Sequence, residues 1–144
     1  MDTKRSVVRI VIFLAVTPAL ISGCATDRVD LVDSGVLTLE QHSTGKVFIA
    51  WSSAYEDGDG FVVAGVLMRH DHVGLPVRAH VDAAILSPDG RVLDESRTPD
   101  IYVPPHVTGR AQKLRRFKVR FTNVPPQGSS VRLVCHSALH DDTT

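Results

Sequence analysis

The chain has 144 residues, and its 16 Lys and Arg residues balance its 16 Asp and Glu residues, so its formal net charge is zero. This balance argues against a nucleic-acid-binding protein, which is normally strongly basic, and two cysteines are too few for a small disulfide scaffold or a zinc ribbon. The length fits one ordinary domain, and a composition of 43% hydrophobic and 22% charged residues is globular rather than disordered.

Residues 1–23 have the pattern of a cleaved export signal rather than of part of the fold. Three cations precede an apolar run over residues 10–21, which is too short for a membrane-spanning helix of about 20 residues. The run ends in Ile21-Ser22-Gly23-Cys24. This motif resembles the lipobox of bacterial lipoproteins, with Ile21 at the position where leucine is usual.

The resemblance implies that Cys24 receives a thioether-linked diacylglycerol, becomes the first residue after cleavage and is then N-acylated. Two or more acyl chains anchor a protein stably, whereas one chain holds it only marginally. In this family an aspartate after the cysteine favours the inner membrane, so Ala25 points to the inner leaflet of the outer membrane, facing the periplasm. The alternatives are a plain secretory signal or an uncleaved N-terminal anchor, with Cys24 incidental.

Cleavage would change the charge of the chain. Removing residues 1–23 takes away three cations and one acid, so 13 basic residues face 15 acidic ones in the 121 residues left, and the net charge becomes −2. We expect the lipidated cysteine and a polar tether at residues 24–34, although the three aliphatic residues there would also suit a first strand. A β-domain is expected at residues 35–139 and a flexible tail at 140–144.

The pattern within the expected domain is a succession of short strands. Every second residue is apolar over residues 77–86, 116–122 and 131–135, and helical periodicity is absent. Residues 61–69 form a continuous apolar run, which predicts a central strand covered on both faces. Ser87-Pro88-Asp89-Gly90 is typical of a tight turn between two strands of a hairpin. The expected strands are 35–40, 46–51, 61–69, 77–86, 91–96, 101–103, 116–122 and 131–138.

Seven or eight strands with turns every 8–12 residues predict an all-β fold, an antiparallel β-sandwich, with Trp51 as an anchor of its core. Residues 80–96, 117–121 and 125–134 are similar to the immunoglobulin-like or fibronectin-III-like modules of small envelope lipoproteins. The resemblance covers about half of the chain after the signal and implies an immunoglobulin-like sandwich. The Cys…Trp…Cys framework of antibody domains is absent, and a fold alone does not establish a chemistry.

The seven histidines all follow the signal segment, and the densest group contains Met68, His70 and His72. These three side chains would share one face of an extended strand. Imidazole with thioether suits copper, and two imidazoles with a carboxylate suit zinc. A metal site there, completed by His80 or His136 from a neighbouring strand, is one interpretation. The other is a solvated strand end that runs into a turn.

Six of the 13 cations after the signal fall within residues 110–120. Arg116, Lys118 and Arg120 would form a ladder with a spacing of about 7 Å on the outer face of one strand, while the neighbouring phenylalanines point inward. Such a face suits lipid phosphates, lipopolysaccharide or an acidic partner. Alternatively, the charges protect an edge strand from strand addition. Because the rings point inward and cannot stack on bases, nucleic acid is not an expected partner.

Other candidate chemistry is weaker. If Cys24 is acylated, Cys135 has no intramolecular partner, and strand alternation predicts a buried core position for it. His136 would point to the opposite face, so a Cys/His nucleophile is not expected. The acidic, glycine-rich residues 56–60 fail the spacing of a calcium loop and predict a hairpin. No nucleophile elbow, phosphate loop, zinc-protease or dinucleotide motif occurs, so we do not expect an enzyme.

Together these features predict a membrane-anchored periplasmic lipoprotein that is a non-enzymatic binding or scaffolding module for a protein or another envelope component, without a cofactor. The alternative is an envelope copper- or zinc-binding protein that uses Met68, His70 and His72.

The lipid anchor predicts a labelling result. In cells fed radioactive palmitate, we expect the wild-type chain to carry label and the Cys24→Ser chain to carry none, since the serine hydroxyl cannot form the thioether. An unlabelled wild-type chain would contradict both the anchor and the envelope location.

Overall fold

The computed structural model describes residues 28–105 and 114–137. The predicted signal segment 1–23 with its lipobox (Ile21, Ser22, Gly23), the acylation site Cys24 and the tail 140–144 lie outside the described residues. The described ranges contain eight strands and no helix that could cross a membrane.

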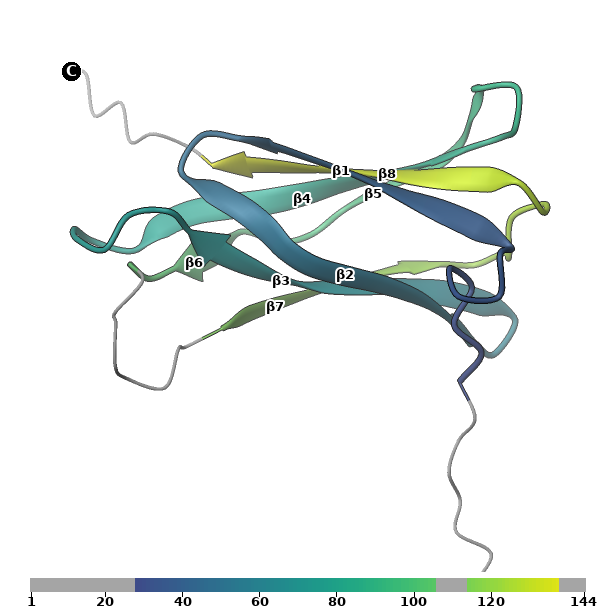
Figure 1. Cartoon of the computed structure of the whole chain (residues 1–144), viewed down its shortest axis with the longest axis horizontal. Helices are drawn as coiled ribbons and strands as arrows, with labels where there is room; N and C mark the ends of the chain where they lie inside the picture. The colour runs from purple at the N-terminus through teal and green to yellow at the C-terminus, as the bar shows by residue number, and fades with distance from the viewer. Residues whose placement is uncertain (1–27, 106–113, 138–144) are drawn as a thin grey trace, which may run out of the picture.

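Two sheets make up the fold and stack as layers (Figure 1). One sheet has five strands, in the order β1-β8-β4-β5, with β6 also paired to β4. The other has three, in the order β2-β3-β7. The predicted all-β fold with two sheets and eight strands is therefore confirmed. The strands are β1 (Leu37–Thr44), β2 (Val47–Asp57), β3 (Gly60–Arg69), β4 (Val77–Leu86), β5 (Val92–Arg97), β6 (Ile101–Val103), β7 (Arg115–Phe121) and β8 (Ser129–Ser137).

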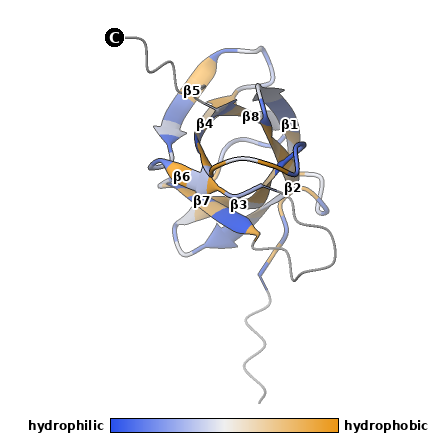
Figure 2. Ribbon diagram, turned by 90° about the vertical axis from the view of Figure 1, so that its left-hand side faces the viewer, coloured by the Kyte–Doolittle hydropathy of each residue, from blue (hydrophilic) through white to orange (hydrophobic). Residues whose placement is uncertain are grey.

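Alternation along the strands builds the core between the sheets. In β4 and β7 every second side chain is buried, as the sequence predicts, and the rings of Phe61 and Phe121 stack with their centroids 5.0 Å apart. Cys135 is also fully buried, in agreement with its predicted core position. Figure 2 views the layers along the strand direction, with β4, β8 and β1 on one side and β7, β3 and β2 on the other.

The expectation of a wholly antiparallel sandwich is wrong for one pair, because β1 runs parallel to β8. The segment before β1 joins the sandwich near the end of β2, where the Leu31 amide donates to the Ala54 carbonyl oxygen at 2.8 Å. The chain must return to the start of β2 at Val47, so β1 can run in only one direction, and that direction is the same as that of β8. The turn from β1 to β2 contains Gly45, whose φ of +96° favours glycine. A Cβ atom added at this position would collide with the Ser137 side chain.

The expected core anchor Trp51 is instead on the surface, with 56% of it exposed. Val47 and Ile49 are buried, so simple alternation would send Trp51 inward as well. The register between β2 and β3 shifts between Ile49 and Trp51, and this bulge turns the next residues to the other face. The same strand also continues past Ser52 and Ser53, where the sequence predicts its end, as far as Asp57.

The packed part of the chain begins before residue 35. Leu31 is fully buried in the core, and Asp30 forms an isolated bridge with Tyr55. The Asp30 carboxylate accepts hydrogen bonds from the amides of Val32 (2.8 Å) and Asp33 (3.1 Å), which holds the turn that leads into β1. Within residues 24–34, the last five therefore belong to the sandwich.

The burial of Leu31 predicts a large cost for its truncation. Leu31→Ala should lower the free energy of unfolding by about 3 kcal/mol, because it leaves a cavity in the core. Val29→Ala removes a side chain that is 47% exposed and should change it by less than about 0.5 kcal/mol. Urea denaturation measures both, and equal effects would show that this segment is a tether without a structural role.

Candidate functional site

The outer face of the three-stranded sheet combines aromatic, aliphatic and cationic side chains. The apolar strip of this face is formed by the outward side chains of β3, and all of these side chains except that of Val62 are partly exposed. The prediction that this strand is covered on both faces is therefore wrong. No further layer of described residues covers it. We call the following set the aromatic-cationic face: Phe48, Trp51 and Tyr55 from β2, Val62, Ala64, Val66 and Met68 from β3, and Arg116, Lys118 and Arg120 from β7.

The strand register places the residues of this face in rows across the sheet. Trp51 is opposite Val66, which is opposite Arg116. Tyr55, Val62 and Arg120 form a second row in the same way. Each row therefore runs from an aromatic ring, over an aliphatic side chain, to a cation.

The structure places the predicted cation ladder on the outward side of an edge strand. Arg116, Lys118 and Arg120 are exposed, and β7 pairs with β3 alone among the described strands. Arg120 forms an ion pair with Asp57, whereas no ion pair to an acidic side chain joins Arg116 or Lys118 within the described ranges. Both interpretations of the ladder, an anion-binding face and a protected edge, fit this placement.

The described chain also begins on this face. The Arg28 guanidinium lies 4.8 Å from the centroid of the Tyr55 ring, a cation–π contact. The Glu56 amide donates to the Val29 carbonyl oxygen at 3.1 Å, which fixes the entering chain beside the end of β2. In Figure 1 this N-terminal segment lies on the side of the three-stranded sheet.

The predicted metal ligands Met68, His70 and His72 lie at the end of β3 and in the loop after it. The His70 ring stacks on Phe48 with a centroid separation of 4.2 Å. Between Met68 and His70, the buried Arg69 donates to the carbonyl oxygens of Leu75 (2.6 Å) and Val73 (3.1 Å). This part of the chain is thus a strand end whose loop Arg69 holds in place.

Arg69 also binds the carboxylate of Asp71, and this hydrogen bond holds the pKa of Asp71 below its ordinary value. The Lys46 ammonium lies 3.5 Å from the same carboxylate. The Asp71 carboxylate is therefore paired with two cations of the protein itself.

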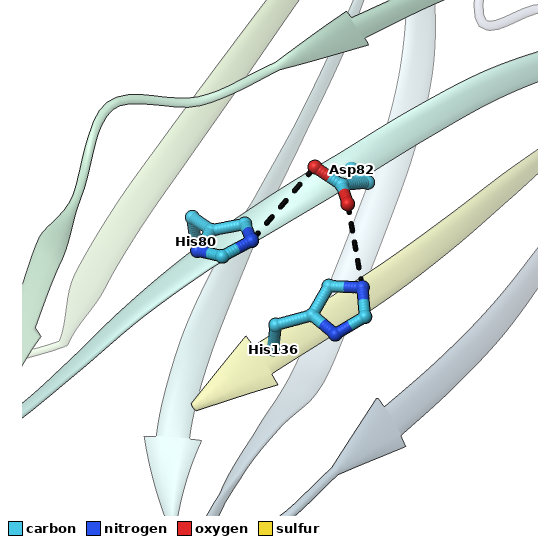
Figure 3. A group of neighbouring side chains, drawn as sticks. All are labelled: His80, Asp82 and His136. Carbon is cyan, nitrogen blue, oxygen red and sulfur yellow. Dashed lines mark ion pairs between the residues drawn. The ribbon is translucent and has the colours of Figure 1, made fainter. Parts of the chain in front are cut away.

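A different group converges on the outer face of the five-stranded sheet, as Figure 3 shows. His80 and Asp82 point outward from β4, and His136 points outward from β8 directly opposite His80. Nε2 of His136 lies 3.3 Å from Oδ2 of Asp82, and Nε2 of His80 lies 3.9 Å from Oδ1. Over the part of the chain that the structure describes, this is the only group of three His, Cys, Asp or Glu residues whose ligand atoms all lie within 4.8 Å of one another.

The surroundings of this cluster are polar. Arg97 donates two hydrogen bonds to the Asp82 carboxylate, and this contact lowers the pKa of Asp82 from its ordinary value. Nδ1 of His80 lies 3.8 Å from a carboxylate oxygen of Asp100, and Nδ1 of His136 lies 3.5 Å from the Thr44 hydroxyl. All three members of the cluster are only partly buried.

An open groove of about 480 Å³ adjoins the cluster on the same sheet. Asp82 lines one part of it, Ala84 and Val134 contribute apolar surface, and Arg97 and Arg132 contribute positive charge. The groove and the cluster together form a second face with a chemistry distinct from the first.

The hypothesis that His80 or His136 completes a site with His70 is wrong, because the two groups lie on opposite outer faces of the sandwich. His70 stacks on Phe48, outside the three-stranded sheet, and the other two imidazoles lie outside the five-stranded one. Alternation along β4 and β8 marks both imidazoles as outward. It does not reveal that the two strands are neighbours, so Asp82 could not be identified as their shared partner.

The core cysteine offers no reactive group beside this cluster. Burial raises the pKa of the Cys135 thiol to about 11, and the thiol points inward while His136 points outward. A Cys/His nucleophile is therefore absent from this strand.

Neither the family models, nor the curated proteins, nor the solved structures compared with the chain gave a match.

Proposed function

We propose that the chain is a lipid-anchored, non-enzymatic binding module of the bacterial envelope, and that its aromatic-cationic face binds the phosphate-bearing headgroups of the membrane that holds Cys24. The observation that carries this proposal is the contact between Arg28 and Tyr55, which puts the start of the described chain on that face. Following Ala25, we assign the module to the inner leaflet of the outer membrane.

The short link to Cys24 supports this orientation. Arg28 follows Cys24 by four residues, and four fully extended residues span at most about 14 Å. Acyl chains on Cys24 would therefore hold the nearest face of the sandwich at the membrane surface. The opposite face, with the groove and the imidazoles, would point into the aqueous periplasm.

The side chains of the face suit a membrane surface. A Lys or Arg near an anionic bilayer contributes about 1 kcal/mol of binding, and Arg28, Arg116 and Lys118 have no acidic ion-pair partner among the described residues. Arg120 contributes less, since Asp57 already neutralises it. Trp51 has the amphipathic ring that is enriched at membrane–water interfaces. Because the net charge after cleavage is −2, attraction to anionic lipid must come from this face and not from the whole domain.

The strand pairing supports an immunoglobulin-like type for the sandwich. In that type the second and fifth strands pair in one sheet, and the third and sixth pair in the other. With β2 as the first strand, and with β5 and β6, which both pair with β4, counted together as the fourth, β7 is the fifth strand and β8 the sixth. On this count, β3 with β7 and β4 with β8 reproduce the two pairings. The departure is at the edge beside β8, where the last strand of an immunoglobulin domain would lie and where β1 runs in parallel instead.

The membrane-binding face predicts a loss of affinity when its charges are removed. For the unacylated chain from residue 24 with Cys24→Ser, Arg116→Gln with Lys118→Gln should weaken binding to phosphatidylglycerol vesicles by about 30-fold, the equivalent of two cations. Co-sedimentation measures the binding, and micelles of lipopolysaccharide in place of vesicles show which phosphate-bearing lipid is preferred.

The matched control is Arg78→Gln with Arg91→Gln, which removes the same charge from the five-stranded sheet and its turn. It should leave vesicle binding within about twofold of the unsubstituted chain. Equal losses in the two variants, or equal binding to neutral and anionic vesicles, would contradict the proposed face.

A further inference from the structure

We propose that His80, Asp82 and His136 bind one divalent late transition-metal ion, zinc or copper(II), through two imidazole nitrogens and one carboxylate oxygen. Two imidazoles and a carboxylate leave further coordination positions open, and this donor set suits zinc and copper(II) rather than calcium or magnesium. The site does not depend on the membrane-binding face, which lies on the other side of the sandwich.

The distances between the three side chains are close to those of a metal site. Nitrogen and oxygen ligands of zinc lie about 2.0–2.2 Å from the ion, so two tetrahedral ligands lie roughly 3.4 Å from each other. The separation of His136 Nε2 from Asp82 Oδ2, 3.3 Å, already has this value. His80 Nε2 lies 3.9 Å from the other oxygen, Oδ1, and one ligand atom from each of the three residues can be chosen so that all lie within 4.8 Å of one another. The His80 ring must therefore move closer to Oδ2 for both imidazoles and one carboxylate oxygen to bind the same ion.

The backbone under the ligands is fixed before any metal binds. His80 and His136 are opposite each other in the central β4–β8 pair, and their rings stack at 5.2 Å. Their chain neighbours Val81 and Cys135 are fully buried in the core. The ligands thus stand on rigid strands, which keeps the cost of ordering them low.

The second nitrogen of each imidazole has the kind of partner that metal-bound histidines use. Nδ1 of His80 faces Asp100 at 3.8 Å, and Nδ1 of His136 faces the Thr44 hydroxyl at 3.5 Å. Metal-ligating histidines commonly hold their other ring nitrogen on a carboxylate or another oxygen, which fixes the tautomer and the ring orientation. In this arrangement both Nε2 atoms are left to face Asp82 and the ion.

Arg97 competes with a metal ion for the Asp82 carboxylate and would weaken metal binding. Its two hydrogen bonds occupy both oxygens of Asp82, and its positive charge repels a cation. Metal binding must draw one oxygen away from the guanidinium, so removal of Arg97 should tighten it. A network of ion pairs without a metal would show no such gain.

The test is calorimetric titration of the full acylated protein in detergent micelles with zinc chloride and with copper(II) chloride. We expect one ion per chain. His80→Gln and His136→Gln should each weaken binding at least tenfold, and Arg97→Gln should strengthen it. The matched controls His70→Gln and His72→Gln should bind as the wild type does, and magnesium chloride should give no binding heat.

Three results would overturn the site: no binding heat from either metal in the wild type, equal affinity in His80→Gln and the wild type, or loss of binding in the His70 and His72 variants instead. Thermal unfolding of each variant without metal separates a lost ligand from a lost fold, since a folded His136→Gln that still binds metal normally also contradicts the proposal.

Discussion

The burial of alternate side chains between two sheets is the constraint on which the rest of the structure depends. Once Phe61, Phe121 and their neighbours fill the core, each intervening residue must face outward on one side of the sandwich or the other. Arg116, Lys118 and Arg120 therefore share one outer face with Trp51. His80, Asp82 and His136 share the opposite one. The two candidate functions are separate because the core lies between them.

Local alternation made the inward and outward residues of β4 and β7 and the burial of Cys135 predictable. The turn-forming residues at 87–90 made the turn between β4 and β5 predictable. The bulge after Ile49 was not predictable, because nothing in the local sequence marks the extra residue that turns Trp51 outward. The parallel β1 and the β4–β8 pairing depend on contacts between distant segments. The cluster of His80, Asp82 and His136 needs the β4–β8 pairing, so its two imidazoles could be suggested from the sequence and its carboxylate could not.

The two outer faces of the sandwich can serve two different functions. We propose that the aromatic-cationic face lies on the lipid that anchors the chain, which leaves the groove and the imidazole cluster open to the periplasm. The packed start of the chain is central to this arrangement. Because Leu31 is buried and Arg28 stacks on Tyr55, the proposed lipid anchor would be joined to the domain by a short segment at a fixed place on the domain surface.

The orientation is tested most directly by the fluorescence of Trp51, the only tryptophan of the chain. In acylated protein on anionic vesicles, a quencher attached to lipid headgroups should strongly quench Trp51. In the Trp51→Phe, Tyr102→Trp chain, the tryptophan moves to β6 on the opposite sheet and should stay unquenched. Quenching of both to the same extent, or of the second alone, would contradict the proposed orientation.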